Sequence, residues 1–419
     1  MTFALLVRAF RHRNFKLFYG GQGVSLIGTW LTRVATGWLV YRLTDSVVML
    51  GLVGFATQVP TFLLGPLAGV WVDRLDRHRV LLVTQMAAMA QSALLAVFTF
   101  SGTITVVHVL ALGAFQGCID ALDKPARQAF VLEMVEDRTD LPNAIALNSS
   151  MVNLARMLGP SAAGILIATV GEAWCFLLDA VSYLAVIASL LAMRVKRSWR
   201  PGRVNRVLAD LREGWGYVVR FSPIRGVLLL LAAVSILGIP SMVLLPVFAT
   251  RVLSGGPHTL GFLMAGSGFG ALLGALYLAS RKSVLGLGRL IPVGAGTFGL
   301  ALMAFAESRT FWLSMLLMIV CGASMMIHMA TSNTVVQTLV DDDKRGRVMS
   351  LYAMALVGAE PFGNLLVGAS ANGWGAPTAV LLGGALCTAC AVVFLRAAPR
   401  LRASARLTYA KLGILGEAS

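Results

Sequence analysis

The chain alternates between long apolar runs and short polar connections along its whole length. A helix that crosses a bilayer needs roughly 20 mostly apolar residues, and twelve runs come close to that length or exceed it. These runs lie at 15–41, 47–72, 80–100, 104–122, 141–168, 172–193, 224–250, 258–280, 286–306, 310–333, 347–370 and 374–397. The pattern predicts an all-α membrane protein with twelve transmembrane helices.

The connections carry an uneven distribution of charge, which predicts orientation. Of the 35 Lys and Arg residues, all but five lie in connections on the same side of the membrane as the N-terminus. Arg42, Arg251 and Arg309 lie on the other side, and Arg33 and Arg156 fall inside helices. Because Lys and Arg accumulate in cytoplasmic loops, we expect both termini in the cytoplasm.

Composition excludes several classes of protein. The chain is 57% hydrophobic and 13% charged, whereas soluble domains have about 25% charged residues. The net charge of +16 does not indicate a nucleic-acid partner, because the basic residues separate apolar runs instead of forming one soluble face. The chain has no HExxH, GxSxG or phosphate-loop sequence, and the GxGxxG at Gly294 lies inside an apolar run instead of following a strand. We therefore expect neither an enzyme nor a metal or cofactor site.

The two halves of the chain repeat each other weakly. Residues 51–74 can be aligned with 261–282, and residues 131–137 resemble 336–342. Two six-helix bundles repeated in parallel are a transporter design in which the substrate binds near the middle of the bilayer. The predicted parts are an N-terminal six-helix bundle over 1–193, a cytoplasmic linker over 194–223, a C-terminal six-helix bundle over 224–397 and a cytoplasmic tail over 398–419.

The linker combines arginines with apolar residues at helical spacing. The apolar positions are Val204, Val207, Leu208, Leu211, Trp215, Val218 and Val219, and the arginines among them are Arg203, Arg206, Arg212 and Arg220. A basic amphipathic helix on the inner leaflet, with its arginines near anionic lipid headgroups, fits this pattern. A solvated linker with some helical content fits it equally well.

A cluster of charge separates the second and third predicted helices. In the sequence GPLAGVWVDRLDRHR, the residues Gly69, Asp73, Arg74, Arg77 and Arg79 resemble motif A of the major facilitator superfamily. Asp76 departs from the motif, which usually has glycine there. The stretches 120–135 and 143–160 further resemble the bacterial exporter branch of that superfamily, which includes the enterobactin exporter and the macrolide efflux pumps.

The resemblance implies the major facilitator fold, with two six-helix bundles and secondary active transport by alternating access. It also implies export of an amphipathic small molecule, such as a siderophore or a drug, by proton antiport across the bacterial cytoplasmic (inner) membrane. The chain departs from the family in having no acidic residue in the first helix and Gly113 where the fourth usually has arginine. The fifth helix keeps a partial antiporter motif at Gly159, Pro160 and Gly164, which favours bending and tight packing.

Motif A suggests a mechanical role. Gly69 lets two helices approach closely, and the carboxylate of Asp73 suits the positive N-terminus of a neighbouring helix. In the family that neighbour is the eleventh helix, which begins here near Gly346. The gating hypothesis is that Asp73 holds the inner gate shut and that Arg74, Arg77 and Arg79 help to re-form it, with Asp120 near the same boundary. The alternative is that the arginines only set the topology. Asp120 and Asp123 lie so near the inner boundary that we expect them to be exposed.

Polar and ionisable residues inside the membrane are costly and usually functional. We expect a central cleft lined by such residues from several helices, with roles in binding substrate or protons. The candidates are Gln22, Thr29, Arg33, Gln116, Asn153, Arg156, Asp179, His328, Glu360 and Asn364.

Proton coupling needs a group that can gain and lose a proton. Glu360 is the first candidate because apolar surroundings favour the acid form of a carboxyl. Asp179 is the second, and His328 is a third. Arg33 and Arg156 do not release protons readily, so they would supply a counter-charge or hold an anionic substrate. A structural ion pair or a polar packing contact is the alternative role for each of these residues.

Two other functions remain open. One is a lysophospholipid flippase or a facilitator without proton coupling, and the other is a membrane receptor or scaffold, which would not need the gating charges of motif A. In each case the partners are a small amphipathic molecule, membrane lipid and, for an antiporter, protons. We expect a monomer.

Overall fold

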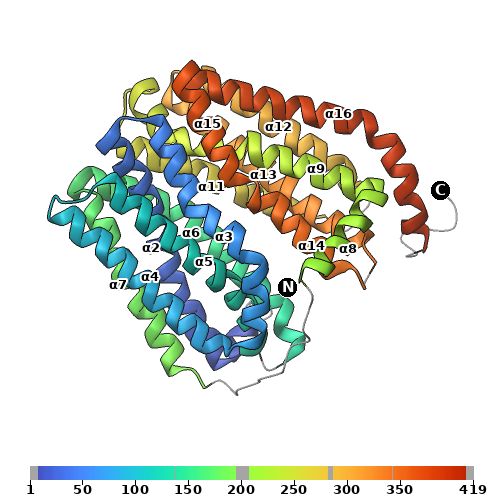
Figure 1. Cartoon of the computed structure of the whole chain (residues 1–419), viewed down its shortest axis with the longest axis horizontal. Coiled ribbons are helices and arrows are strands. Elements are labelled where there is room, and N and C mark those ends of the chain that lie inside the picture. Colours follow the sequence, from blue (N-terminus) through green and yellow to red (C-terminus); the bar gives the residue numbers. More distant parts are fainter. Residues whose placement is uncertain (1–7, 136, 195–206, 282–285, 342, 412–419) are drawn as a thin grey trace. The chain divides into compact units, whose positions relative to one another are not determined.

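The computed structural model describes residues 8–135, 137–194, 207–281, 286–341 and 343–411. Every regular element in these ranges is a helix, which confirms the predicted all-α class. The chain divides into two compact units, Met1–Val204 with Ala249–Ala265, and Asn205–Phe248 with Gly266–Ser419. Figure 1 follows the elements in chain order from blue to red. The domain boundaries expected from the sequence stay a prediction.

The first unit is built mainly from the helices of the N-terminal half. Its elements are η1 (Arg8–Arg11), α2 (Arg13–Thr44), α3 (Val47–Arg74), α4 (Arg77–Phe100), α5 (Val106–Met134), η2 (Arg138–Asp140), α6 (Leu141–Val170) and α7 (Glu172–Ala192), joined by most of η4 (Phe248–Val252) and the first part of α11 (Pro257–Ala279).

The second unit holds the remaining elements. They are α8 (Val207–Arg220), α9 (Ser222–Leu237), η3 (Ile239–Leu244), α10 (Leu245–Val247), the rest of α11, α12 (Leu287–Glu307), α13 (Phe311–Leu339), α14 (Arg345–Ala353), η5 (Met354–Gly358), α15 (Glu360–Trp374) and α16 (Ala376–Lys411).

The two units repeat the same packing partners. In the first unit α4 packs against α5 and α7, and α2 packs against α6 and α7. In the second unit α12 packs against α13 and α16, and α9 packs against α15 and α16. These helices hold corresponding places in the order of the two halves, as a parallel repeat of one bundle requires.

Eleven helical stretches of the described residues are long and apolar enough to cross a membrane. They correspond to the second through twelfth predicted runs. The remaining run lies in α2, which at 32 residues is long enough but carries Lys16, Gln22 and Arg33. A count of twelve is therefore not confirmed, and α2 is the segment on which the twelfth span depends.

The eleventh predicted run is interrupted just before Glu360. Residues 345–374 form α14, then a π-helix over Met354–Gly358, then α15. Pro361, the second residue of α15, lacks an N–H, and its ring would clash with the carbonyl four residues earlier in a regular α-helix. Single π-turns accommodate such breaks and recur at functional sites. Glu360 is consequently the first residue of a new helical segment.

Asp76, which replaces the usual glycine of motif A, has a clear structural role. It is the N-cap of α4, and its carboxylate Oδ1 accepts hydrogen bonds from the backbone N–H groups of His78 at 3.1 Å and Arg79 at 3.3 Å. These N–H groups have no partner inside the helix, and aspartate is among the best residues to satisfy them. The turn between α3 and α4 thus uses a side chain where the family usually has none.

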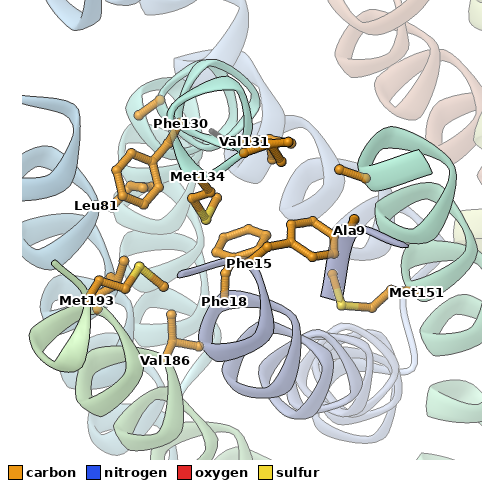
Figure 2. Close-up of a cluster of buried hydrophobic side chains, with 14 of the residues drawn as sticks. Ala9, Phe15, Phe18, Leu81, Phe130, Val131, Met134, Met151, Val186 and Met193 are labelled. Carbon is orange, nitrogen blue, oxygen red and sulfur yellow. The ribbon is translucent and has the colours of Figure 1, made fainter. Parts of the chain in front are cut away.

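A buried aromatic cluster holds one end of the first unit together. Phe15 and Phe18 of α2 lie among Phe130 and Met134 of α5 and Val186 of α7, all with little or no exposed surface. Figure 2 shows Phe15, Phe130 and Met134 directed into the same buried space. The cluster holds α2, α5 and α7 together at one end. It therefore restrains the positions of the polar groups farther along these helices.

Candidate transport site and gating residues

Asp179 of α7 lies where three helices of the first unit meet. Its side chain is buried, with 1% of the residue exposed. Its Oδ2 accepts hydrogen bonds from the hydroxyls of Thr32 on α2 and Ser92 on α4, both at 2.7 Å. Its Oδ1 has no hydrogen-bond partner among the described residues. A Cβ added at Gly28 would lie 2.7 Å from that oxygen, so the backbone of α2 covers this side of the carboxyl.

The contacts of Asp179 are unusual for a buried acid. Within the part of the chain that the structure describes, its hydrogen bonds come from hydroxyl groups, and no Lys or Arg forms an ion pair with it. Burying an ionised carboxylate without a cation costs several kcal/mol. Protonation of Asp179 would remove that cost. Oδ1 is the oxygen that can take the proton, because it makes no hydrogen bond among the described residues.

Two aspartates of α5 are paired, in contrast to Asp179. Asp123 forms an ion pair with Arg127 of its own helix and accepts hydrogen bonds from Thr84 at 2.9 Å and Gln85 at 2.8 Å. Only 3% of Asp123 is exposed. The expected exposure of Asp123 is therefore wrong, because α5 continues to Met134 and packs this residue against α4.

Asp120 also has a cation. It forms an ion pair with Lys124 at 2.8 Å and accepts a hydrogen bond from Gln116 at 2.8 Å, both on α5. Its side chain is partly exposed. Two of the predicted residues, Gln116 and Asp120, therefore act on each other directly.

The three predicted site residues of α2 differ in exposure. Gln22 is buried, whereas Thr29 and Arg33 are exposed on the first unit. Thr29 donates a hydrogen bond to the carbonyl of Ser25 at 3.0 Å, and the guanidinium of Arg33 lies 4.8 Å from the ring centre of Trp30. The three predicted residues of α2 therefore do not share one environment.

On α6, Asn153 and Arg156 are half-buried. Asn153 donates a hydrogen bond to the carbonyl of Ser149 at 3.0 Å, one turn earlier in its own helix. Arg156 engages other groups of the chain. Neither contact reaches Asp179.

The predicted residues of the second unit are strongly buried, apart from Glu360. His328 of α13 has no exposed surface; its Nδ1 lies 3.0 Å from the carbonyl oxygen of Ile291 on α12, and its Nε2 has no partner in the described ranges. Asn364 of α15 is 1% exposed, and neither atom of its amide group is hydrogen-bonded there. Glu360 is half-buried and engaged with other groups.

The motif A residues divide by their contacts. Arg77, in the first turn of α4, forms an ion pair with Glu133 near the end of α5 at 2.6 Å. Arg74 is exposed, and Arg79 lies 3.6 Å from the carboxylate of Asp76. Gly69 and Asp73 lie in α3, but their side-chain surroundings are outside the described part of the structure. The contact of Arg77 joins the start of α4 to the end of α5.

Sequence reasoning missed Thr32, Ser92 and Glu133, which complete these contacts. Thr32 and Ser92 are single hydroxyl residues in apolar runs, which are common packing residues and carry no sequence signal for a partner. Glu133 lies inside the run 120–135 that resembles the exporter branch. An acid at the end of a helix that neighbours an arginine-rich turn is the signal that could have identified it.

Comparison with known proteins identifies the family of the chain. The family model described as transmembrane secretion effector matches residues 6–411. The staphyloferrin A transporter of Staphylococcus aureus is 26% identical over 86% of this chain and 90% of its own length. The multidrug efflux pump Tap of Mycolicibacterium fortuitum is 26% identical over 83% and 87%. The macrolide efflux protein A of Streptococcus pyogenes is 23% identical over 91% and 96%.

The fold also matches a solved transporter structure. A bacterial homologue of the human lysosomal transporter Spinster, in an inward-facing and unoccupied conformation, aligns with a TM-score of 0.68 at 15% identity. The alignment covers 98% of this chain and 99% of that one. The chain is thus a multi-pass transporter of small molecules and not an enzyme, and it belongs to the transmembrane secretion effector family of the major facilitator superfamily.

Proposed function

We propose that this transporter exports an amphipathic small molecule, such as a siderophore or a drug, across the bacterial cytoplasmic membrane in exchange for protons. The named activities of the relatives, staphyloferrin A transport and multidrug or macrolide efflux, support the substrate class. The observation that carries the proton coupling is the environment of Asp179, a buried carboxyl that two hydroxyls and, among the described residues, no cation contact.

The proton cycle follows from the contacts of Asp179. In its acid form the carboxyl carries the proton without a buried charge. In its ionised form, the two hydroxyl donors supply part of the stabilisation that water would give. Since Thr32 and Ser92 belong to α2 and α4, a small displacement of either helix would change how well the ionised form is stabilised. Proton release can in this way be linked to helix movement.

Glu360 is the second acid in the proposal. It is half-buried and begins α15 directly after the π-helix. Acids at such interruptions can be displaced by small changes of helix geometry. Arg33 and Thr29, exposed on the first unit, are proposed to contact the substrate, and Arg156 to supply a positive charge to it.

The gating role of motif A is also a proposal. The ion pair of Arg77 with Glu133 supports it, since this pair joins the ends of α4 and α5. Loss of transport in Asp73→Asn, at an unchanged level of folded protein, is the expected result. Asp137→Asn, which makes the same change at an exposed acid outside motif A, is the matched control. Transport by Asp73→Asn at the wild-type rate would contradict a latch.

The proposed orientation has both termini in the cytoplasm and the proposed unit of function is a monomer. The distribution of Lys and Arg supports the orientation. Labelling of an introduced cysteine at Ser254, in the connection before α11, with a membrane-impermeant thiol reagent on intact cells tests it. Light scattering of the purified detergent complex tests the oligomeric state.

Proteoliposomes of known orientation test proton-coupled transport. A pH gradient is imposed, and internal pH is followed with a trapped dye while a siderophore, a macrolide and a lysophospholipid are added separately. Proton movement that depends on one of the first two compounds and disappears in Asp179→Asn is the expected result. Asp137→Asn, an exposed acid outside the spans, is the matched control.

Other outcomes assign the other functions. Proton movement lost in Glu360→Gln but retained in Asp179→Asn would place the proton on Glu360. Movement of a labelled lysophospholipid that is insensitive to a protonophore, with no proton movement for any compound, would replace the antiporter with a flippase. Substrate flux without proton movement would indicate a facilitator.

A further inference from the structure

Helix α8 (Val207–Arg220), with 14 residues, is too short to cross a membrane. It is outside the eleven candidate spans, and the next span begins at Ser222, two residues after α8 ends. One residue, Phe221, thus separates α8 from the start of a candidate span. A helix so placed has one side available to the protein and one side available to the membrane surface.

The protein side of α8 contacts the start of the interrupted span. Glu213 forms an ion pair with Arg347 of α14 at 2.5 Å. Gly214 lies against the same residue, since a Cβ at Gly214 would be 3.1 Å from the Cβ of Arg347. The absence of a side chain at position 214 thus lets α8 approach α14 closely enough for the ion pair to form.

A tyrosine extends this contact to the connection before α14. The hydroxyl of Tyr217 donates a hydrogen bond to Asp341 at 3.2 Å, and the ammonium group of Lys344 lies 5.0 Å from the centre of the Tyr217 ring. Burial raises the pKa of Tyr217 above its ordinary value, so the phenol keeps its proton and remains a donor. Two positions one turn apart on α8 therefore hold both sides of the turn that leads into α14.

The other side of α8 is basic and aromatic. Trp215 is 62% exposed and Val219 42% exposed, and Arg212 and Arg220 are exposed beside them. At about 100° per residue, Arg212, Trp215 and Val219 fall on one face of α8, opposite Gly214 and Tyr217. In the described ranges the side chains of Arg212 and Arg220 have no hydrogen bond or ion pair.

These observations specify the partner of the exposed face. Tryptophan favours the interface between lipid and water, and each arginine near an anionic bilayer raises binding by about fivefold. A soluble acidic protein would match the charge but not the position of α8 at the point where the chain enters the membrane. An anionic lipid surface matches both.

We propose that α8 binds an anionic lipid surface through Arg212, Trp215 and Val219, and that this binding stabilises α14 through the contacts of Glu213 and Tyr217. Lipid composition then controls how firmly the first turns of the interrupted span are held. This inference goes beyond the proposed transport function and does not depend on the identity of the substrate or the coupling ion.

Hydrogen–deuterium exchange of the full chain in nanodiscs tests the coupling. One set of nanodiscs contains phosphatidylcholine alone, and the other contains phosphatidylcholine with phosphatidylglycerol. We expect phosphatidylglycerol to slow exchange in both α8 and α14 of the wild type. Glu213→Gln should speed exchange in α14 by about two- to fivefold, the range of a partly exposed ion pair, and should remove the response of α14 to lipid.

Neighbouring substitutions separate the two faces. Arg212→Gln should remove the lipid response of both helices while exchange in α14 in phosphatidylcholine stays at the wild-type value. Tyr217→Phe deletes one hydroxyl group and should weaken the coupling without loss of the folded state. Trp215→Phe should remove a component of the fluorescence that brominated phosphatidylglycerol quenches.

Three results would overturn the proposal. One is an α8 that responds to phosphatidylglycerol while α14 of the wild type does not. Another is a Glu213→Gln variant whose α14 keeps the full lipid response. The third is equal protection of α8 by soluble glycerol phosphate in phosphatidylcholine nanodiscs, which would identify a free phosphate as the ligand in place of a lipid surface.

Discussion

Gly164 of α6 and Gly261 of α11 form a helix crossing in which the two backbones touch. A Cβ at Gly261 would lie 2.8 Å from the Cα of Gly164, and a Cβ at Gly164 would lie 2.7 Å from the carbonyl oxygen of Pro257. Both glycines belong to the first unit. The tight packing predicted for Gly164 from the partial antiporter motif therefore has a defined partner at the start of α11.

Gly164→Ala should destabilise the protein by about 1–3 kcal/mol, because the added methyl group has no space and the backbones must separate. The measurement is thermal unfolding of the purified transporter in detergent. Gly20→Ala is the matched control, since nothing lies within 4 Å of a Cβ at that position in α2, and alanine is the better helix former. Equal melting temperatures for the two variants would show that the crossing is not tight.

Asp123 and Asp179, both deeply buried, should respond in opposite ways to the same substitution. Asp123→Asn removes the partner of Arg127 and should cost about 1–3 kcal/mol, since it leaves a charged group unpaired. Asp179→Asn removes a charge that has no cation, so the fold should persist while proton movement is lost. Thermal unfolding and dye-based proton uptake, measured on the same preparations, distinguish a structural carboxylate from a proton carrier.

A different result would reassign both residues. If Asp179→Asn unfolds the protein as readily as Asp123→Asn does, Asp179 holds the helices together as an ionised group. Ser92→Ala provides a second probe, because it removes one donor from the Asp179 carboxylate and leaves the carboxyl itself in place. It should shift the pH dependence of transport without abolishing transport.

An exposed ion pair between Asp45 and Arg251 should make stability depend weakly on pH. The carboxylate of Asp45 accepts a hydrogen bond from Arg251 at 2.6 Å, which lowers the pKa of Asp45 below its ordinary value. A depressed pKa in the folded state gives stability that is present above the unfolded pKa, about 4, and is lost as pH falls through the folded pKa.

The melting temperature of the wild type should therefore fall more steeply below about pH 4 than that of Asp45→Asn. Asparagine is a suitable replacement because Asp45 has a φ of 49°, a conformation that asparagine tolerates. The difference in melting temperature between the two proteins should also shrink at high salt, since the ion pair is exposed to solvent. Identical pH profiles for the two proteins would mean that the pair contributes nothing.

The spans could be predicted from the sequence because bilayer thickness and backbone hydrogen bonding impose a strong, local pattern. The contacts of the candidate site could not. Asp179 stands out as an acid in an apolar run, but Thr32 and Ser92 are distant in sequence and are chosen as partners by the packing of α2 and α4 against α7. The π-helix before Glu360 likewise depends on how the chain accommodates Pro361, and the spacing of apolar residues does not predict it.

Substitutions at Asp76 separate a capping role from a gating role within motif A. If Asp76 acts only as the N-cap of α4, stability should follow the capping order, with aspartate and asparagine equal, glycine a few tenths of a kcal/mol lower and alanine about 1 kcal/mol lower. Transport per folded molecule should stay constant across this series. A gating role predicts the reverse, with Asp76→Asn stable but impaired in transport because the charge near Arg79 is lost. Melting temperature and substrate flux, measured on all three variants, decide between the two, and a constant flux would assign this departure from motif A to helix capping alone.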